Sequence, residues 1–240
     1  MYAYLVYYIL GFVMIPGIVL GITAQIKVKT TFEEFSSTPT SRGRTAKEVA
    51  RTMLNGGGCH DTQIKQIRGE LTDNYNPKTN IVSLSENVAN ENSISAIGVA
   101  AHEIGHVFQH KQNYAPVKIR NALVPVLNYS SLLMWPMIIL GLIFEIAYYS
   151  TWATALIYIG VGIYALNTVF CLVTLPVELN ASKKAYDMLV STNEMTEEEA
   201  KKAKKVLNAA AWTYVAALIT SILSLIRVLL FIFAMRGDRR

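Results

Sequence analysis

The chain has 240 residues, of which 52% are hydrophobic, and a formal net charge of +5. This apolar content exceeds that of ordinary soluble domains and predicts several membrane spans. A modest basic excess in such a protein is typical of cytoplasmic loops, which argues against nucleic acid as a partner. Two cysteines, Cys59 and Cys171, are too few for a disulfide framework.

Several stretches of the sequence are apolar and long enough to cross a bilayer, namely residues 2–26, 123–149, 152–175 and 212–235. The connection near Ser150 is so short that the middle two stretches are predicted to form a hairpin. Lys and Arg residues concentrate in the segments 27–120 and 183–205 and are absent from the hairpin tip. The positive-inside rule therefore predicts that both basic segments are cytoplasmic in a multi-pass membrane protein.

The segment 27–120 carries the patterns of a small soluble domain. Thr45 and Glu48 are spaced as a capping box, which predicts a helix that begins there. Ser93 is a suitable N-cap for a second helix. Short runs that predict strands lie between the two helices, at residues 63–68, 70–75 and 81–85. We expect an α+β domain in which a small antiparallel sheet lies beside the second helix.

The second helix contains the pentapeptide His-Glu-Ile-Gly-His at residues 102–106. On an α-helix His102 and His106 project from one face, so their imidazoles form half of a tetrahedral zinc site. Glu103 lies close enough to act as general base on a zinc-bound water without binding the metal itself. Gly105 is a poor helix former, and we expect it to allow another backbone to approach closely. The motif predicts the metal-binding and catalytic half of a metallopeptidase.

A catalytic zinc ion needs a third protein ligand, and Glu178 is the strongest candidate. It directly follows the third apolar stretch, where a buried carboxylate requires a partner. The hairpin of two spans returns the chain to the side of the membrane that carries the two histidines. His110, one helical turn further on, is predicted to face solvent. Cys59 and His60 follow a glycine run in a loop and stay open as further metal contacts.

Other residues have candidate roles around the metal. Ser182 shares a helix face with Glu178 and is predicted to hydrogen-bond a ligand, and Asn180 is a less favourably placed candidate for that role. The donor that stabilises the transition state is left open among Tyr75, His110, Tyr186 and Arg120. Either the strand at 81–85 or the one at 70–75 is expected to be the sheet edge that receives an extended substrate.

The chain resembles the YugP-like family of bacterial neutral zinc metallopeptidases and, more distantly, the membrane peptidases of the HtpX and Ste24 type. The resemblance covers nearly the whole chain and rests on residues 71–77, 100–106 and 175–182. It implies Zn²⁺ held by His102, His106 and Glu178, with Glu103 as general base. The chain departs from the family pattern at three positions where acidic or histidine residues are usual, namely Asn74, Asn76 and Asn180.

These features predict a membrane-anchored zinc metalloendopeptidase of the bacterial cell membrane, with a zincin-like helix and sheet on about four transmembrane helices. We divide the chain into a first transmembrane helix (1–26), the zincin-like domain (27–120), a transmembrane hairpin (121–176), cytoplasmic helices with the third ligand (177–211), and a last transmembrane helix with a basic tail (212–240). The active site is predicted at the cytoplasmic face. A peptide or membrane-protein substrate and the lipid bilayer are the expected partners, and the oligomeric state is left open.

Two alternatives stay open at this point. A non-enzymatic membrane scaffold with a structural metal would close the site with a fourth protein ligand, for which Cys59 and His60 are the candidates. An intramembrane metalloprotease would place the motif inside a span. Polar residues crowd both ends of the motif helix, from Glu91 to Gln112, and argue against that position.

Overall fold

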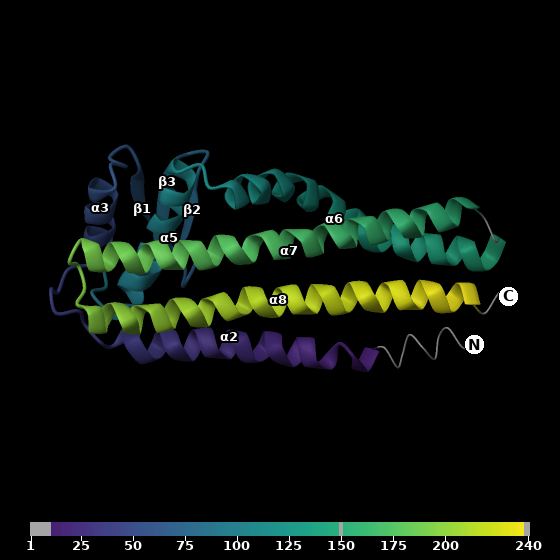
Figure 1. Cartoon of the computed structure of the whole chain (residues 1–240), viewed down its shortest axis with the longest axis horizontal. Coiled ribbons are helices and arrows are strands. Elements are labelled where there is room, and N and C mark those ends of the chain that lie inside the picture. Colours follow the sequence, from purple (N-terminus) through teal and green to yellow (C-terminus); the bar gives the residue numbers. More distant parts are fainter. Residues whose placement is uncertain (1–10, 149–150, 238–240) are drawn as a thin grey trace. The chain divides into compact units, whose positions relative to one another are not determined.

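The computed structural model describes residues 11–148 and 151–237 (Figure 1). The chain divides into two compact units. The helical unit comprises Met1–Ile22, Lys118–Leu175 and Tyr214–Arg240, and the mixed unit comprises Thr23–Val117 and Pro176–Thr213. Each of the long helices contributes residues to both units: α2 (Ile15–Ser36), α6 (Ala115–Tyr148), α7 (Thr151–Ser191) and α8 (Glu197–Gly237).

The mixed unit contains short elements whose boundaries follow local sequence signals. Its elements are α3 (Ala46–Gly56), β1 (Gln63–Ile67), β2 (Asn74–Asn76), β3 (Ile81–Ser85), α4 (Glu86–Ala89) and α5 (Ile94–Lys111). The predicted capping box is confirmed, since Thr45 accepts from the Glu48 amide while Glu48 accepts from the Thr45 amide. Ser93 also caps α5 as predicted, because its hydroxyl accepts from the Ala96 amide at 3.2 Å.

The prediction of an antiparallel sheet is wrong for one of its two strand pairs. The strand order is β1-β3-β2, with β1 parallel to β3 and β2 antiparallel to β3. The chain leaves a gap one strand wide between β1 and β2, and the tight turn at 77–80 folds β3 back into it. Asn80 closes this turn with φ of 53°, a left-handed conformation that asparagine tolerates. Because β3 is central, the open edges of the sheet are β1 and β2.

Helix α5 is buried on almost every side, as its small and apolar residues predict. It packs in one core with α3, whose inward-facing Met53 and Leu54 are fully buried, and with β3. A Cβ at Gly105 would lie 2.4 Å from the carbonyl oxygen of Ala181 in α7. The expectation that Gly105 allows a close backbone approach is thus confirmed, and the neighbouring backbone belongs to the helix that carries Glu178.

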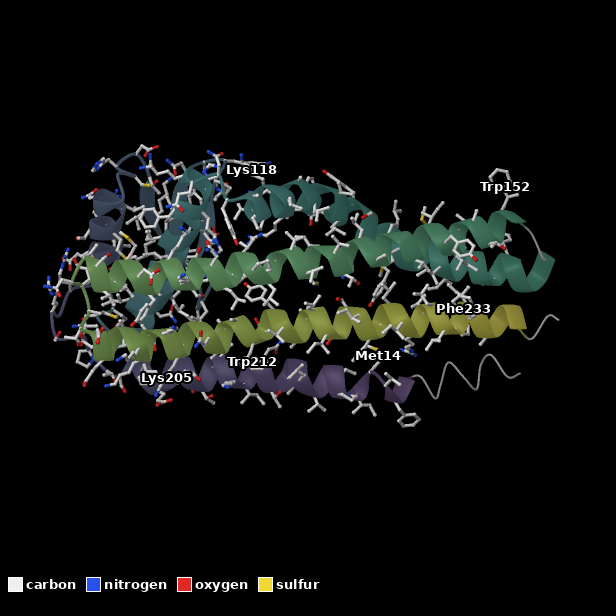
Figure 2. All side chains as sticks on the ribbon, viewed as in Figure 1. Met14, Lys118, Trp152, Lys205, Trp212 and Phe233 are labelled. Atoms are coloured by element: carbon white, nitrogen blue, oxygen red, sulfur yellow. The ribbon has the colours of Figure 1, made fainter. Side chains whose placement is uncertain are left out.

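The described part of the helical unit is built from apolar helices. Three described helices are long and apolar enough to cross a membrane: Ala115–Gly141, Trp152–Ser191 and Glu197–Ala234. The first expected span, 2–26, begins in residues outside the described ranges. Bulky side chains such as Trp152 and Phe233 project outward from α7 and α8 (Figure 2). Between α6 and α7, Gly160 packs near the Met134 carbonyl, the small-residue packing typical of membrane helices.

Candidate metal centre

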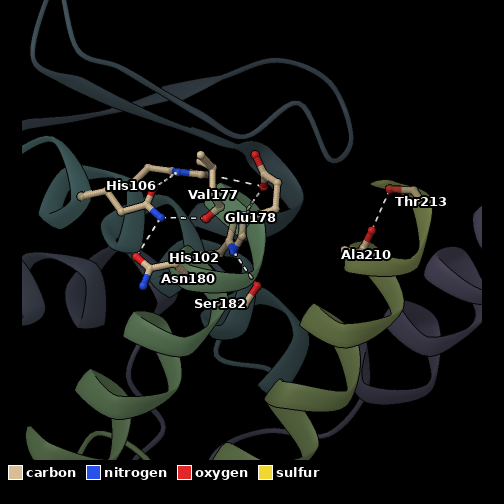
Figure 3. A network of polar contacts seen from close by, with 9 residues as sticks. His102, His106, Val177, Glu178, Asn180, Ser182, Ala210 and Thr213 are labelled. Atoms are coloured by element: carbon tan, nitrogen blue, oxygen red, sulfur yellow. Dashed lines mark hydrogen bonds and ion pairs between the residues drawn. The ribbon is translucent and has the colours of Figure 1, made fainter. Parts of the chain in front are cut away.

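Two helices of the mixed unit bring the predicted ligands together. His102 and His106 lie on α5, and Glu178 lies on α7 in the segment that belongs to the mixed unit. Their ligand atoms all lie within 4.8 Å of one another, and among the described residues they form the group of His, Cys and acidic side chains with metal-binding geometry (Figure 3). The histidine pair predicted from its four-residue spacing and the glutamate that follows the third apolar stretch therefore lie at one site.

Both imidazoles point at the same carboxylate oxygen. The Nε2 atoms of His102 and His106 lie 3.2 and 3.5 Å from Oε2 of Glu178. The two rings are nearly perpendicular, at 84°, with centroids 4.8 Å apart. The histidine side chains are each 16% exposed and the Glu178 side chain is 5% exposed. The carboxylate is therefore held inside the protein, while both imidazoles remain reachable from outside.

The donor set fits a zinc ion. Donor atoms about 2.0–2.2 Å from a tetrahedral zinc lie roughly 3.3–3.5 Å from one another. The two nitrogen-to-oxygen separations, 3.2 and 3.5 Å, are close to these edges. Two neutral imidazoles and one carboxylate also match the three-ligand sets of catalytic zinc sites, which keep one position open.

The protein surroundings shift the proton affinity of two groups on α5. Burial raises the pKa of Glu103 above its ordinary value, although the neighbouring His102 and His106 oppose the shift. Burial alone would lower the pKa of His106, but the hydrogen bond to Glu178 and the charge of Glu103 raise it. A proton and a metal cation therefore compete for the same nitrogen, as in most histidine metal sites.

Ser182 and Asn180, the two residues predicted to support a metal ligand, have different hydrogen-bond partners. The Ser182 hydroxyl lies 3.2 Å from Nδ1 of His102, the ring nitrogen opposite the one that faces Glu178. Asn180 instead pairs with Gln109, since its Oδ1 accepts from the Gln109 amide at 3.0 Å. Ser182 thus supports a histidine directly, whereas Asn180 acts one contact further away (Figure 3).

Gln109 is a functional-site residue that the sequence analysis missed. The sequence pattern assigns it no role, yet its Oε1 accepts from Nδ1 of His106 at 2.9 Å. Its Nε2 donates to the carbonyl of Val177 at 2.7 Å. The position three residues after His106 places both side chains on one helix face, which is the signal that would have indicated the contact.

Tyr75 and His110, two candidates for stabilising the transition state, contact each other. The Tyr75 hydroxyl lies 3.4 Å from Nδ1 of His110 and donates to Oδ1 of Asn80 at 3.2 Å. Burial raises the pKa of Tyr75, so its phenol stays protonated and remains a donor. That proton already has an acceptor in Asn80. His110 is exposed, as predicted, and lies outside the metal-binding group.

The other two candidates have different surroundings. Tyr186 packs against the hydrophobic core and carries the Lys204 ammonium 5.0 Å from its ring centroid. Arg120 belongs to the helical unit. Neither observation links Tyr186 or Arg120 to the candidate ligands. Of the four candidate donors, Tyr75 and His110 are therefore the pair whose described contact lies at the helix that carries the two histidine ligands.

The loop that contains Cys59 and His60 supplies no ligand to the described group. Cys59 is 4% exposed, and burial raises the pKa of its thiol above the ordinary value. His60 is exposed, with Nδ1 3.3 Å from Oδ1 of Asn55. The described residues thus offer neither side chain as the fourth ligand that a closed structural site would need.

Comparison with known proteins now gives the family. Residues 10–233 match the family described as "Putative neutral zinc metallopeptidase". The chain is 40% identical over 222 residues to the "Putative membrane protease YugP" of Bacillus subtilis (strain 168), an alignment that covers 92% of this chain and 96% of the relative. The chain belongs to this family of zinc metallopeptidases. No solved structure matches it. Family membership confirms the resemblance seen in the sequence and supports a peptidase with a zinc cofactor.

Proposed function

We propose that the protein is a membrane-anchored zinc metalloendopeptidase, with His102, His106 and Glu178 as zinc ligands and Glu103 as general base. The observation that carries this proposal is the approach of both histidine Nε2 atoms to one carboxylate oxygen, at 3.2 and 3.5 Å. Membership of a zinc metallopeptidase family supports it independently.

Catalysis would divide between the metal and Glu103. When bound, Zn²⁺ supplies a Lewis acid that acidifies water and polarises a peptide carbonyl. Glu103 is buried beside the ligands, and its raised pKa makes its carboxylate a stronger base than an exposed glutamate. It would take a proton from the attacking water and deliver it to the nitrogen of the departing amine. The two histidines and Glu178 would hold the cation throughout.

The substrate would be an extended peptide bound along β2. This strand is an open edge of the sheet, because β3 occupies the centre. It also lies beside the ligand-bearing helix, since the rings of Tyr75 in β2 and His110 in α5 are 6.1 Å apart. A peptide added to a sheet edge gains main-chain hydrogen bonds whatever its side chains are. The edge therefore favours broad sequence specificity.

The active site would lie at the cytoplasmic face of the bacterial membrane. The concentration of Lys and Arg in the segments 27–120 and 183–205 supports this orientation. An intramembrane protease is less well supported, because α5 is not among the described helices that are apolar and long enough to cross a membrane. Anchoring next to membrane-protein substrates would raise their effective concentration at the site.

Replacement of Glu103 by glutamine tests the chemistry. We expect purified, zinc-loaded Glu103→Gln protein to cleave fluorescently labelled casein at least about 10³-fold more slowly than the wild type, because proton transfer is lost. Its zinc content should stay at the wild-type level, since Glu103 is not a ligand. The exposed Glu91→Gln variant is the matched control and should cleave normally. Unchanged cleavage by Glu103→Gln would falsify the role of Glu103.

Replacement of Glu178 by alanine tests the ligand set. The variant should lose zinc to a chelator at concentrations that the wild type withstands, because only two protein ligands remain. Full metal occupancy in Glu178→Ala, measured by atomic emission after gel filtration, would remove Glu178 from the ligand set.

A further inference from the structure

Gln109 is a buried amide that joins the two ligand-bearing helices. Its side chain is fully buried, which is costly for an amide unless its polar atoms are paired. All the polar groups are used: Nε2 donates to the Val177 carbonyl at 2.7 Å and to Oδ1 of Asn180 at 3.0 Å, and Oε1 accepts from His106 at 2.9 Å. The residue therefore connects α5 to the turn of α7 that contains Glu178.

These contacts determine which way round the amide lies. The oxygen and nitrogen of a glutamine side chain are distinguished by their hydrogen-bond partners. The Val177 carbonyl can only accept, so it must face the Gln109 NH₂ group. The amide oxygen is then left to face Nδ1 of His106, which must carry a hydrogen to be a donor. That hydrogen leaves Nε2, the nitrogen that faces Glu178, as the one available to a metal.

We propose that Gln109 is a positioning residue that holds His106 in the tautomer and ring orientation needed to bind the metal through Nε2. It does so by tying the imidazole to the backbone of Val177, so that the separation of His106 and Glu178 is set by the packing of α5 on α7. This inference rests on the proposed function, in which both residues are zinc ligands.

His102 is held in a different way, which makes the effect of Gln109 specific. Its Nδ1 faces the Ser182 hydroxyl at 3.2 Å. A hydroxyl can rotate and can either donate or accept, so it selects neither tautomer by itself. The planar amide of Gln109 has no such freedom once Val177 occupies its donor side. Loss of Gln109 should therefore affect metal binding more than loss of Ser182.

The test compares two glutamines that bridge the same two helices. Gln109→Met keeps the length of the side chain but removes all three hydrogen bonds. Gln112→Met is the matched control, because Gln112 accepts from Lys184 of α7 on the exposed side of the helix pair. Zinc affinity is measured by chelator competition, and the Co²⁺-loaded proteins report ligand geometry in their visible absorption bands.

We expect Gln109→Met to weaken zinc binding by about 10–100-fold and to shift the cobalt bands. Gln112→Met should stay within about twofold of the wild type, as an exposed contact away from the ligands should. In a His106→Ala background, Gln109→Met should weaken zinc binding no further, because the residue acts through His106. A folded Gln109→Met protein with wild-type zinc affinity and cobalt bands would overturn the proposal.

A measurement on the unaltered sequence covers the case in which Gln109→Met does not fold. In zinc-loaded wild-type protein with ¹⁵N-labelled histidine, long-range ¹H–¹⁵N spectra distinguish the protonated from the metal-bound ring nitrogen. We expect a protonated Nδ1 on His106, and a metal-bound Nδ1 would overturn the proposal. If His106→Ala alone leaves zinc affinity unchanged, the ligand set itself is wrong, and that result separates failure of the proposed function from failure of the role of Gln109.

Discussion

The two units of this protein place apolar side chains in opposite ways. In the mixed unit, large residues such as Met53, Leu84 and Ile104 are fully buried in one core. In the helical unit, Leu132 is 77% exposed and Trp152 is 82% exposed. Burial removes apolar surface from water in the first unit, whereas the second unit presents it outward, as a protein does when lipid is its solvent. One chain therefore contains regions stabilised by different physical means.

This difference bears on where a rigid site can be built. The candidate ligands all belong to the mixed unit, where the buried Gln109 side chain has hydrogen-bond partners for both of its amide atoms. In lipid, helices associate through close packing of small residues and gain no hydrophobic driving force. The packed core of the mixed unit can thus hold the ligand side chains in a fixed geometry, while the helical unit provides attachment to the membrane.

Replacing one glycine in each unit by alanine tests the difference in packing between the two units, and of the substitutions that compare the units it has the largest expected effect. Gly105→Ala would force a Cβ to 2.4 Å from the backbone oxygen of Ala181, so α5 and α7 must separate. We expect a loss of about 4–5 kcal/mol in unfolding free energy, together with weakened zinc binding. Gly162→Ala, on α7 in the helical unit, meets no atom within 4 Å and should be neutral or slightly stabilising. Thermal unfolding in detergent, followed by circular dichroism, measures both, and equal effects would contradict the packing described for Gly105.

Truncation of one leucine in each unit tests the difference in side-chain burial between the two units, with a smaller expected effect. Leu84→Ala removes a fully buried side chain from β3 and should cost about 3–4 kcal/mol, because it leaves a cavity. Leu132→Ala removes a side chain that contacts little protein and should cost less than about 0.5 kcal/mol in detergent. Denaturant titration of the purified variants gives both values. A large loss for Leu132→Ala would indicate that this side chain is buried by another protein surface.

Charge at exposed leucines distinguishes the solvents of the two units. Leu132→Lys should make membrane insertion of α6 less favourable by about 2.5–3 kcal/mol, because the position is apolar and lies well within the candidate span. Leu71→Lys, at a leucine that is 44% exposed in the loop before β2, should have no effect on insertion. The inserted fraction is counted by glycosylation of engineered acceptor sites on either side of α6. Normal insertion of the Leu132→Lys chain would argue that this face of α6 is in contact with water.

Local sequence signals were sufficient for the parts of the fold that depend on residues within one or two helical turns. The capping pairs at Thr45 and Ser93 and the approximate positions of β1 and β3 follow from neighbours a few residues away. The side-by-side placement of His102 and His106 has the same origin, because a four-residue step returns to one helix face. Glu178 was found by a coarser argument, that an even number of spans brings the chain back to the same side.

Tertiary packing decided the strand pairing and the hydrogen-bond partners at the candidate metal centre, because these contacts join residues that are distant in sequence. The parallel pairing of β1 with β3 depends on where the chain places β2, which no local pattern encodes. The selection of Gln109 as the partner of His106 depends on the Val177 carbonyl, 68 positions away, occupying the other side of the amide. A buried polar group takes its role from whichever acceptors surround it, and only the packing of α5 against α7 supplies them.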